Sequence, residues 1–113
     1  RTEQLFAFQA YQLQSFVDIV TIGKVSQVCA TLFTEEYTPK AGLLSQTFTA
    51  STSAIKSSLA MLHILLNEGY YGPEGKIATL HRYFTHKLEQ LSHKYPHLIH
   101  GPFGKGSMIA FTP

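Results

Sequence analysis

Lys24 is the residue best suited to chemistry, because it follows a short β-branched run and a glycine. Residues 18–22 read Asp-Ile-Val-Thr-Ile, which predicts a buried strand, and Gly23 allows a turn or the close approach of another group. A lysine at the end of a buried strand lies beside a low-dielectric interior, which disfavours the ammonium form and leaves an amine that can form a Schiff base. The alternative is an ordinary solvated lysine, since strand ends commonly carry exposed charge.

Thr47 is a second candidate, because it lies in a hydroxyl-rich stretch, residues 45–53, directly before a helical pattern. A hydroxyl and the unpaired amides of a helix N-terminus favour an anion such as phosphate. Helix capping explains the same residues equally well, with Ser51, Thr52 or Ser53 accepting from the amides of the first turn.

The histidines do not predict a metal site. His81 and His86 are five residues apart, and Pro96 separates His93 from His97, so no zinc-type spacing occurs on a continuous helix. Solvated or locally hydrogen-bonded histidines are expected, His100 included.

Cys29 lies in an apolar run with no histidine near it in sequence, which predicts a buried packing residue. As the single cysteine it excludes an intramolecular disulfide and fits a reducing compartment.

Residue patterns predict a mixed α/β chain with the order β, β, α, α, β, β. Residues 5–13 predict a short helix or turn. The apolar spacing of Ile55, Leu59, Leu62 and Leu66 predicts a helix that stops at Gly69, and a second helix is expected from residue 77 to Pro96. The remaining expectations are buried strands at 18–23 and 28–34, a polar loop at 35–42, a connector at 70–75, a strand start at 98–100, a turn at 101–106 and a strand at 108–112.

Composition is that of a globular domain, with 44% hydrophobic and 14% charged residues among 113. The charged fraction is below the roughly 25% of an average domain, so we expect more of the surface than usual to be covered by something else. A net charge of +2 argues against a nucleic-acid partner, and no apolar run is long enough to span a membrane. No signal segment opens the chain, which favours a cytoplasmic location.

The chain begins at Arg1 without methionine and ends just after an expected strand. A lone terminal strand needs partners, so we expect a fragment of a longer polypeptide.

Three segments in order carry a resemblance to a known family: Arg1-Thr2, Leu5-Phe6-Ala7-Phe8, and the run from Asp18 to Lys24. They resemble the class III (subgroup II) pyridoxal-phosphate-dependent aminotransferases, whose segment reads approximately G-R-T-G, L-F-A-F-E and P-D-I-V-T-L-G-K. Residues 98–110 are similar to the family's entry into its C-terminal small domain, and Gln27-Val28-Cys29 is similar to a run in lysine 6-aminotransferases. Residues 46–52 match the family's S-T-F-G-G-N-P only at Thr47 and Phe48, which leaves the amino donor open.

The resemblance implies an aspartate-aminotransferase-like fold, with residues 1–72 ending the large cofactor domain and residues 73–113 beginning the small domain. It implies transfer of an amino group from an amino acid or amine to a 2-oxo acid, with Lys24 forming the internal aldimine and moving the proton. Thr47 would bind the cofactor phosphate from the neighbouring subunit of a homodimer, with Gln46 near it.

The resemblance also implies that the isolated fragment is not a competent transaminase. The family's acidic partner of the ring nitrogen and its glycine-rich loop lie upstream of Arg1, and its substrate-binding arginine lies downstream of Pro113. Two alternatives stay open: a small non-catalytic α/β interaction module, and a phosphate-ligand binder that needs no Lys24.

Overall fold

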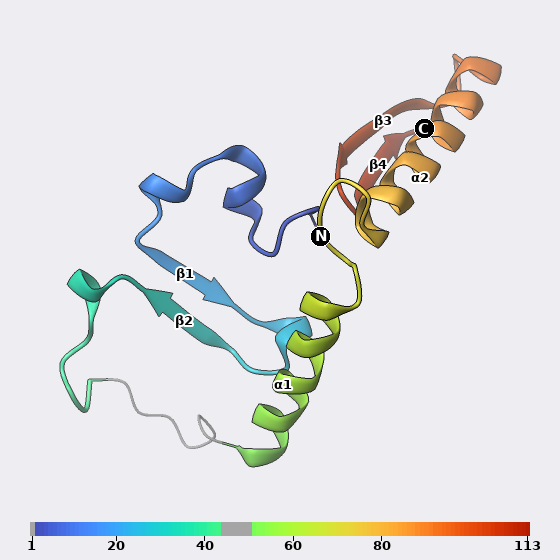
Figure 1. The fold of residues 1–113 in the computed structure, drawn as a ribbon. Coiled ribbons are helices and arrows are strands. Elements are labelled where there is room, and N and C mark those ends of the chain that lie inside the picture. Colours follow the sequence, from blue (N-terminus) through green and yellow to red (C-terminus); the bar gives the residue numbers. More distant parts are fainter. Residues whose placement is uncertain (1, 44–50) are drawn as a thin grey trace. The chain divides into compact units, whose positions relative to one another are not determined.

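The computed structural model describes residues 2–43 and 51–113. The chain divides into two compact units. Arg1–Leu13 with Gly69–Pro113 form the helix-hairpin unit, and Gln14–Glu68 form the ribbon unit. Both contain helical and strand segments, which confirms the predicted mixture of helix and strand (Figure 1).

The ribbon unit is built on two antiparallel strands, β1 (Ile19–Ile22) and β2 (Ala30–Phe33). Their register pairs Ile19 with Phe33 and Ile22 with Ala30, so the segment between them reverses the chain. That segment contains the 3-10 helix η3 (Lys24–Ser26), which α1 (Thr52–Asn67) contacts. Both strands occur where the sequence predicts them. The short 3-10 helices η2 (Gln14–Phe16) and η4 (Glu35–Tyr37) flank the ribbon, η4 at the start of the expected loop.

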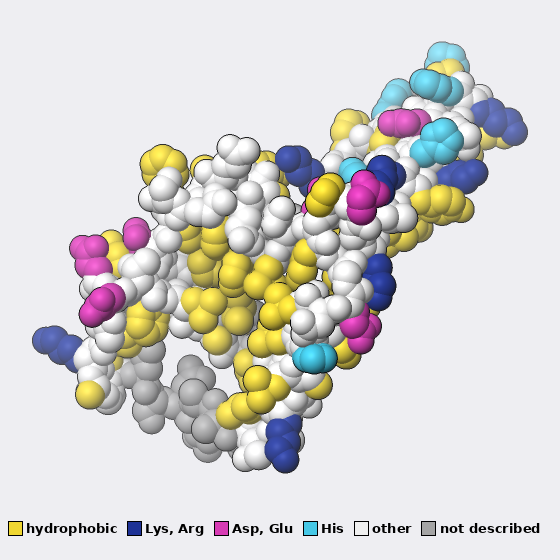
Figure 2. All heavy atoms as spheres, viewed as in Figure 1, with side chains coloured by type: hydrophobic (Ala, Val, Ile, Leu, Met, Phe, Trp, Pro, Cys, Tyr) yellow, Lys and Arg dark blue, Asp and Glu magenta, His cyan; other side chains and the backbone are white. Residues whose placement is uncertain are grey.

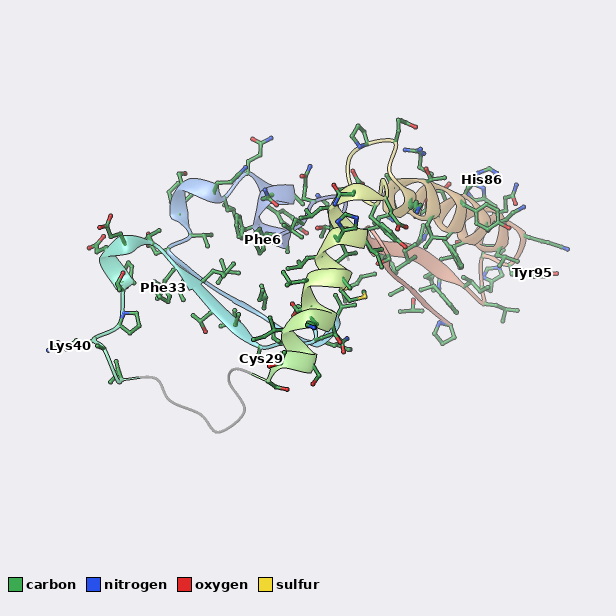
Figure 3. The ribbon with its side chains drawn as sticks, turned by 60° about the horizontal axis from the view of Figure 1, so that its bottom comes forward. Phe6, Cys29, Phe33, Lys40, His86 and Tyr95 are labelled. Atoms are coloured by element: carbon green, nitrogen blue, oxygen red, sulfur yellow. The ribbon has the colours of Figure 1, made fainter. Side chains whose placement is uncertain are left out.

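The expectation that these two strands are buried is wrong. Ile19 is 51% exposed and its partner Phe33 is 40% exposed. A two-stranded ribbon lacks the further strands or packed layer that a buried strand requires. Figure 2 shows hydrophobic side chains at the molecular surface, and Figure 3 shows Phe33 on its strand.

Helix α1 begins and ends where the sequence predicts, with Ser51 at the N-cap and Asn67 as its last residue. The expected capping bond is not formed, because the Ser51 side chain makes no hydrogen bond to the amides of the first turn. Its hydroxyl lies 3.1 Å from that of Ser53 instead.

The helix-hairpin unit places α2 (Lys76–Lys94) against the hairpin of β3 (His100–Lys105) and β4 (Met108–Thr112). The 3-10 helix η1 (Ala7–Tyr11) confirms the short helix expected within residues 5–13. Helix α2 ends just before Pro96, as the sequence predicts. Ala78, on this helix, is 3% exposed and is the only buried hydrophobic residue in the part of the chain that the structure describes. None of the helices in the described ranges is both long and apolar enough to cross a membrane.

The turn predicted over residues 101–106 is mostly strand. β3 continues to Lys105, which pairs with Met108, so only Gly106 and Ser107 form the turn. Gly106, at the first turn position, has a φ of 59°, as in a type II′ hairpin turn. Gly101 and Gly104 lie within β3, and the pairing register with β4 shifts between His100 and Phe103.

Residues 70–75 connect the helices and are tied to the N-terminal segment. The Gly72 amide donates to the Glu3 carbonyl oxygen at 2.9 Å, and the Lys76 amide donates to that of Gly69 at 2.9 Å. Tyr71 is partly buried here, and this burial raises the pKa of its phenol above the ordinary value.

We expect the free energy of unfolding to fall in alkali partly through Tyr71. Its folded-state pKa lies above the unfolded value of about 10, so this contribution is complete below that pH and is lost as pH rises through the raised pKa. Tyr71→Phe removes this titration and leaves a shallower decline. Urea unfolding at about pH 8 and about pH 11 measures the difference. The same decline in both proteins would contradict the assignment.

Candidate functional site

Lys24 begins the η3 turn directly after β1 and Gly23. Gly23 has extended backbone, and a Cβ at this position would lie 3.3 Å from the Cys29 Sγ atom, tighter than an ordinary contact. Gly23 therefore lets the two ends of the turn approach each other. This agrees with the expectation that the glycine serves a close approach.

Two residues of this turn adopt left-handed backbone. Lys24 has a φ of 65° and Gln27 has a φ of 62°. Neither is glycine, and a left-handed conformation costs such residues about 1–2 kcal/mol each. Non-glycine residues held in this region cluster at functional sites. Gln12, at the end of η1, has the same left-handed backbone with a φ of 57°, so the Lys24 turn is distinguished by having two such residues.

Hydrogen bonds within the turn hold this backbone. The Gln27 amide donates to the Lys24 carbonyl oxygen at 3.0 Å, and the Gln27 side-chain amide reaches the same oxygen at 3.4 Å. The Ser26 hydroxyl donates to the Val28 carbonyl oxygen at 2.7 Å. Sequence reasoning assigned no role to Ser26, and Gln27 entered only as part of a family-like run, although two polar residues between Val25 and Val28 were the available signal.

The Lys24 side chain is exposed. The expected low-dielectric surroundings are therefore not found in the described residues, because the strand before Lys24 is itself half exposed. Within the described ranges its amine has no hydrogen bond or ion pair. A free, accessible amine on a strained turn is able to attack a carbonyl carbon.

Thr47 and Gln46 lie outside the described residues. Cys29 was expected to be buried, and this is wrong, since the residue is exposed. The residue precedes β2, whose faces are largely open, so an apolar neighbourhood in sequence does not become a packed one.

His86 makes the local contact that was expected of the histidines, whereas His81 bonds to a residue 25 positions further along the chain. The His81 Nδ1 atom lies 2.8 Å from the Gly106 carbonyl oxygen, which can only accept, so Nδ1 carries the proton and ties α2 to the hairpin turn. His86 lies 3.0 Å from the Gln90 amide. Among the described residues, no three His, Cys, Asp or Glu side chains are grouped as metal ligands.

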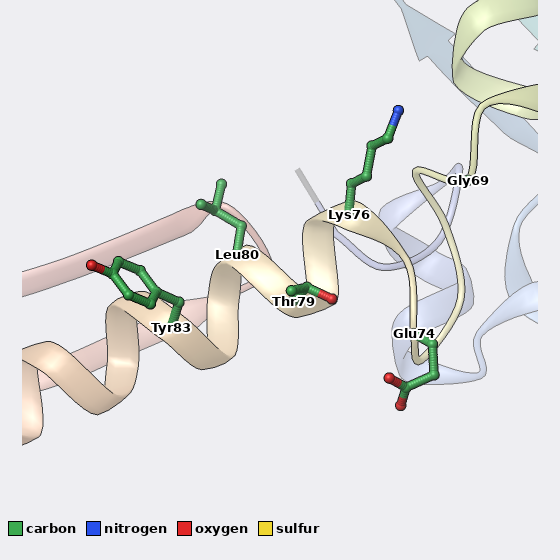
Figure 4. A pocket seen from close by; sticks show the side chains of 6 residues that line it. All are labelled: Gly69, Glu74, Lys76, Thr79, Leu80 and Tyr83. Atoms are coloured by element: carbon green, nitrogen blue, oxygen red, sulfur yellow. The ribbon is translucent and has the colours of Figure 1, made fainter.

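One cavity, about 580 Å³, is a shallow apolar depression at the start of α2. Figure 4 shows Glu74 and Lys76 at its rim pointing to opposite sides. Glu74 also pairs with Arg82 at 3.1 Å. The charged side chains that line this cavity, Glu74 and Lys76, therefore do not point toward a common ligand position (Figure 4).

A smaller, more polar cavity of about 360 Å³ lies between the N-terminal segment and the hairpin turn, with His81 and Lys105 in its wall. The Lys105 Nζ atom sits 4.5 Å from the centre of the Tyr11 ring. His81 and Lys105 thus already contact neighbouring groups of the protein. Neither cavity includes the Lys24 turn.

Comparisons with known proteins leave the site to be interpreted from its own residues. No protein-family model matches the chain, and neither a curated protein nor a solved structure matches it. The functional interpretation rests on the motif around Lys24, the geometry of its turn and the exposure of its amine.

Proposed function

We propose that this chain is part of a class III pyridoxal-phosphate-dependent aminotransferase and that Lys24 is the residue to which the cofactor attaches. The motif formed by Arg1-Thr2, residues 5–8 and residues 18–24 supports the family. The observation that carries the proposal is the accessible Lys24 amine, presented by left-handed backbone at the end of β1. The bound cofactor supplies a pyridine ring that accepts negative charge from the substrate carbon.

The residues present fit covalent attachment. Lys24 would hold the cofactor covalently through its amine, in a condensation with the cofactor's aldehyde that would release one water. No described residue pairs with that amine or competes for it. Gly23 adds no side chain beside it.

The wider proposal follows the family. It includes an aspartate-aminotransferase-like fold, an amino acid or amine as donor and a 2-oxo acid as acceptor. It also includes a homodimer in which Thr47 and Gln46 lie near the cofactor phosphate, and a cytoplasmic location. The domain boundary between residues 72 and 73 belongs to the same proposal.

A non-catalytic interaction module is the second candidate, and exposed apolar side chains favour it. Leu32 is 43% exposed and Tyr37 is 47% exposed, in addition to the open β1–β2 pair. Such a surface serves assembly without requiring a reactive amine. The two candidates differ in whether Lys24 is chemically distinct from the other lysines.

Reductive trapping tests the proposal. The 113-residue chain is incubated with pyridoxal 5′-phosphate, reduced with sodium borohydride and mapped by mass spectrometry for label at each of its seven lysines. We expect Lys24 to carry several-fold more label than Lys40, an exposed lysine that Figure 3 shows pointing outward. Equal label at all lysines would contradict the proposal and favour the interaction module.

A further inference from the structure

We infer that Ser26 is a positioning residue for Lys24, because its buried hydroxyl closes the turn that presents the amine. The inference rests on the proposed role of Lys24. Ser26 is 6% exposed, and its Oγ atom lies 2.7 Å from the Val28 carbonyl oxygen. It makes the shortest of the hydrogen bonds described within the turn.

The position of the bond explains why it matters. Ser26 lies between Lys24 and Gln27, the two residues of this turn with left-handed backbone. Without restraint, both residues favour right-handed or extended backbone, which would turn the Cα–Cβ bond of Lys24 in another direction. The bond from Ser26 to Val28 opposes that relaxation, because it joins the end of η3 to the chain leading into β2.

Helix α1 contacts η3, which helps to explain the burial of Ser26. A hydroxyl in such a place needs a partner, since an unpaired buried polar group is costly. The hydroxyl is therefore held in one orientation, toward Val28. This restraint reaches Lys24 through two residues of backbone, so Ser26 need not contact the cofactor.

Ser58 provides a matched control. It lies on α1 in the same unit and is also 6% exposed, but it makes no hydrogen bond in the described turn. Ser26→Ala and Ser58→Ala remove the same atom from equally buried positions. A general loss of packing would affect both variants alike.

The test repeats reductive trapping with pyridoxal 5′-phosphate on the wild-type chain and both variants, with circular dichroism to measure the folded fraction. We expect the ratio of label at Lys24 to label at Lys40 to fall about fivefold in Ser26→Ala, the effect of losing one net hydrogen bond. It should stay unchanged in Ser58→Ala. Ser26→Thr, which keeps a hydroxyl, should retain most of the preference.

The outcomes separate this inference from the proposed function. A wild-type chain without preference for Lys24 overturns both. A wild-type preference that survives in Ser26→Ala overturns the role of Ser26 alone, as does an equal loss in the two alanine variants. Should Ser26→Ala fail to fold, a folded Ser26→Thr chain that has lost the preference also overturns it.

Discussion

Lys24→Ala is expected to remove most of the Schiff-base absorbance that develops when pyridoxal 5′-phosphate is added to this chain. The other six lysines do not lie on the strained η3 turn, so they form the C=N bond only as ordinary surface amines do. An absorbance titration of wild-type and variant chains measures the loss. The remaining signal should resemble that of free lysine at the same concentration.

Lys40→Ala is the control, because it removes an exposed lysine outside the turn and should leave the band nearly intact. An unchanged band in Lys24→Ala would rule out the attachment role. Retained but reversible binding of the cofactor without Lys24 would instead support a phosphate-ligand binder. The two substitutions therefore distinguish chemistry at one lysine from general reactivity.

Gly104→Ala is expected to disrupt the β3–β4 hairpin. Gly104 has a φ of 109°, and an added Cβ would collide with the Met108 carbonyl oxygen on the opposite strand. Unfavourable backbone and the clash together should lower the free energy of unfolding by about 3 kcal/mol. Thermal unfolding should show a melting temperature lower by on the order of 10 °C.

Gly72→Ala separates the cost of the backbone conformation from the cost of the steric clash. Gly72 also has a positive φ, 91°, but a Cβ there would meet nothing within 4 Å. Its cost should be about 1 kcal/mol, from backbone conformation alone. Equal destabilisation by the two substitutions would show that the approach of Met108 to Gly104 does not matter.

Local patterns were sufficient to predict most of the elements. Four β-branched residues in a row indicated β1, and apolar residues at helical spacing indicated α1 and α2. Such patterns work because backbone preference and the spacing of side chains act over a few neighbouring residues. The turn expected at residues 101–106 failed because strand pairing with β4 overrode the turn preference of glycine and proline.

The candidate site was only partly predictable. Lys24 could be singled out from the glycine and strand before it, but the left-handed backbone at Lys24 and Gln27 has no signal in residue type. Nor did sequence indicate that Ser26 bonds to Val28. Those features depend on how a particular turn closes against α1, which a pattern of neighbouring residues does not encode.

The sequence by itself determined where the strand before Lys24 lies and that a glycine precedes this amine, because both follow from local residue preferences. Tertiary structure alone decided that Ile19, Phe33 and Cys29 are exposed, and that Ser26 is enclosed. Burial depends on what packs over a segment, and the packing groups come from distant parts of the chain. Lys24 therefore lies on an exposed turn with left-handed backbone rather than at the buried strand end that the sequence predicts.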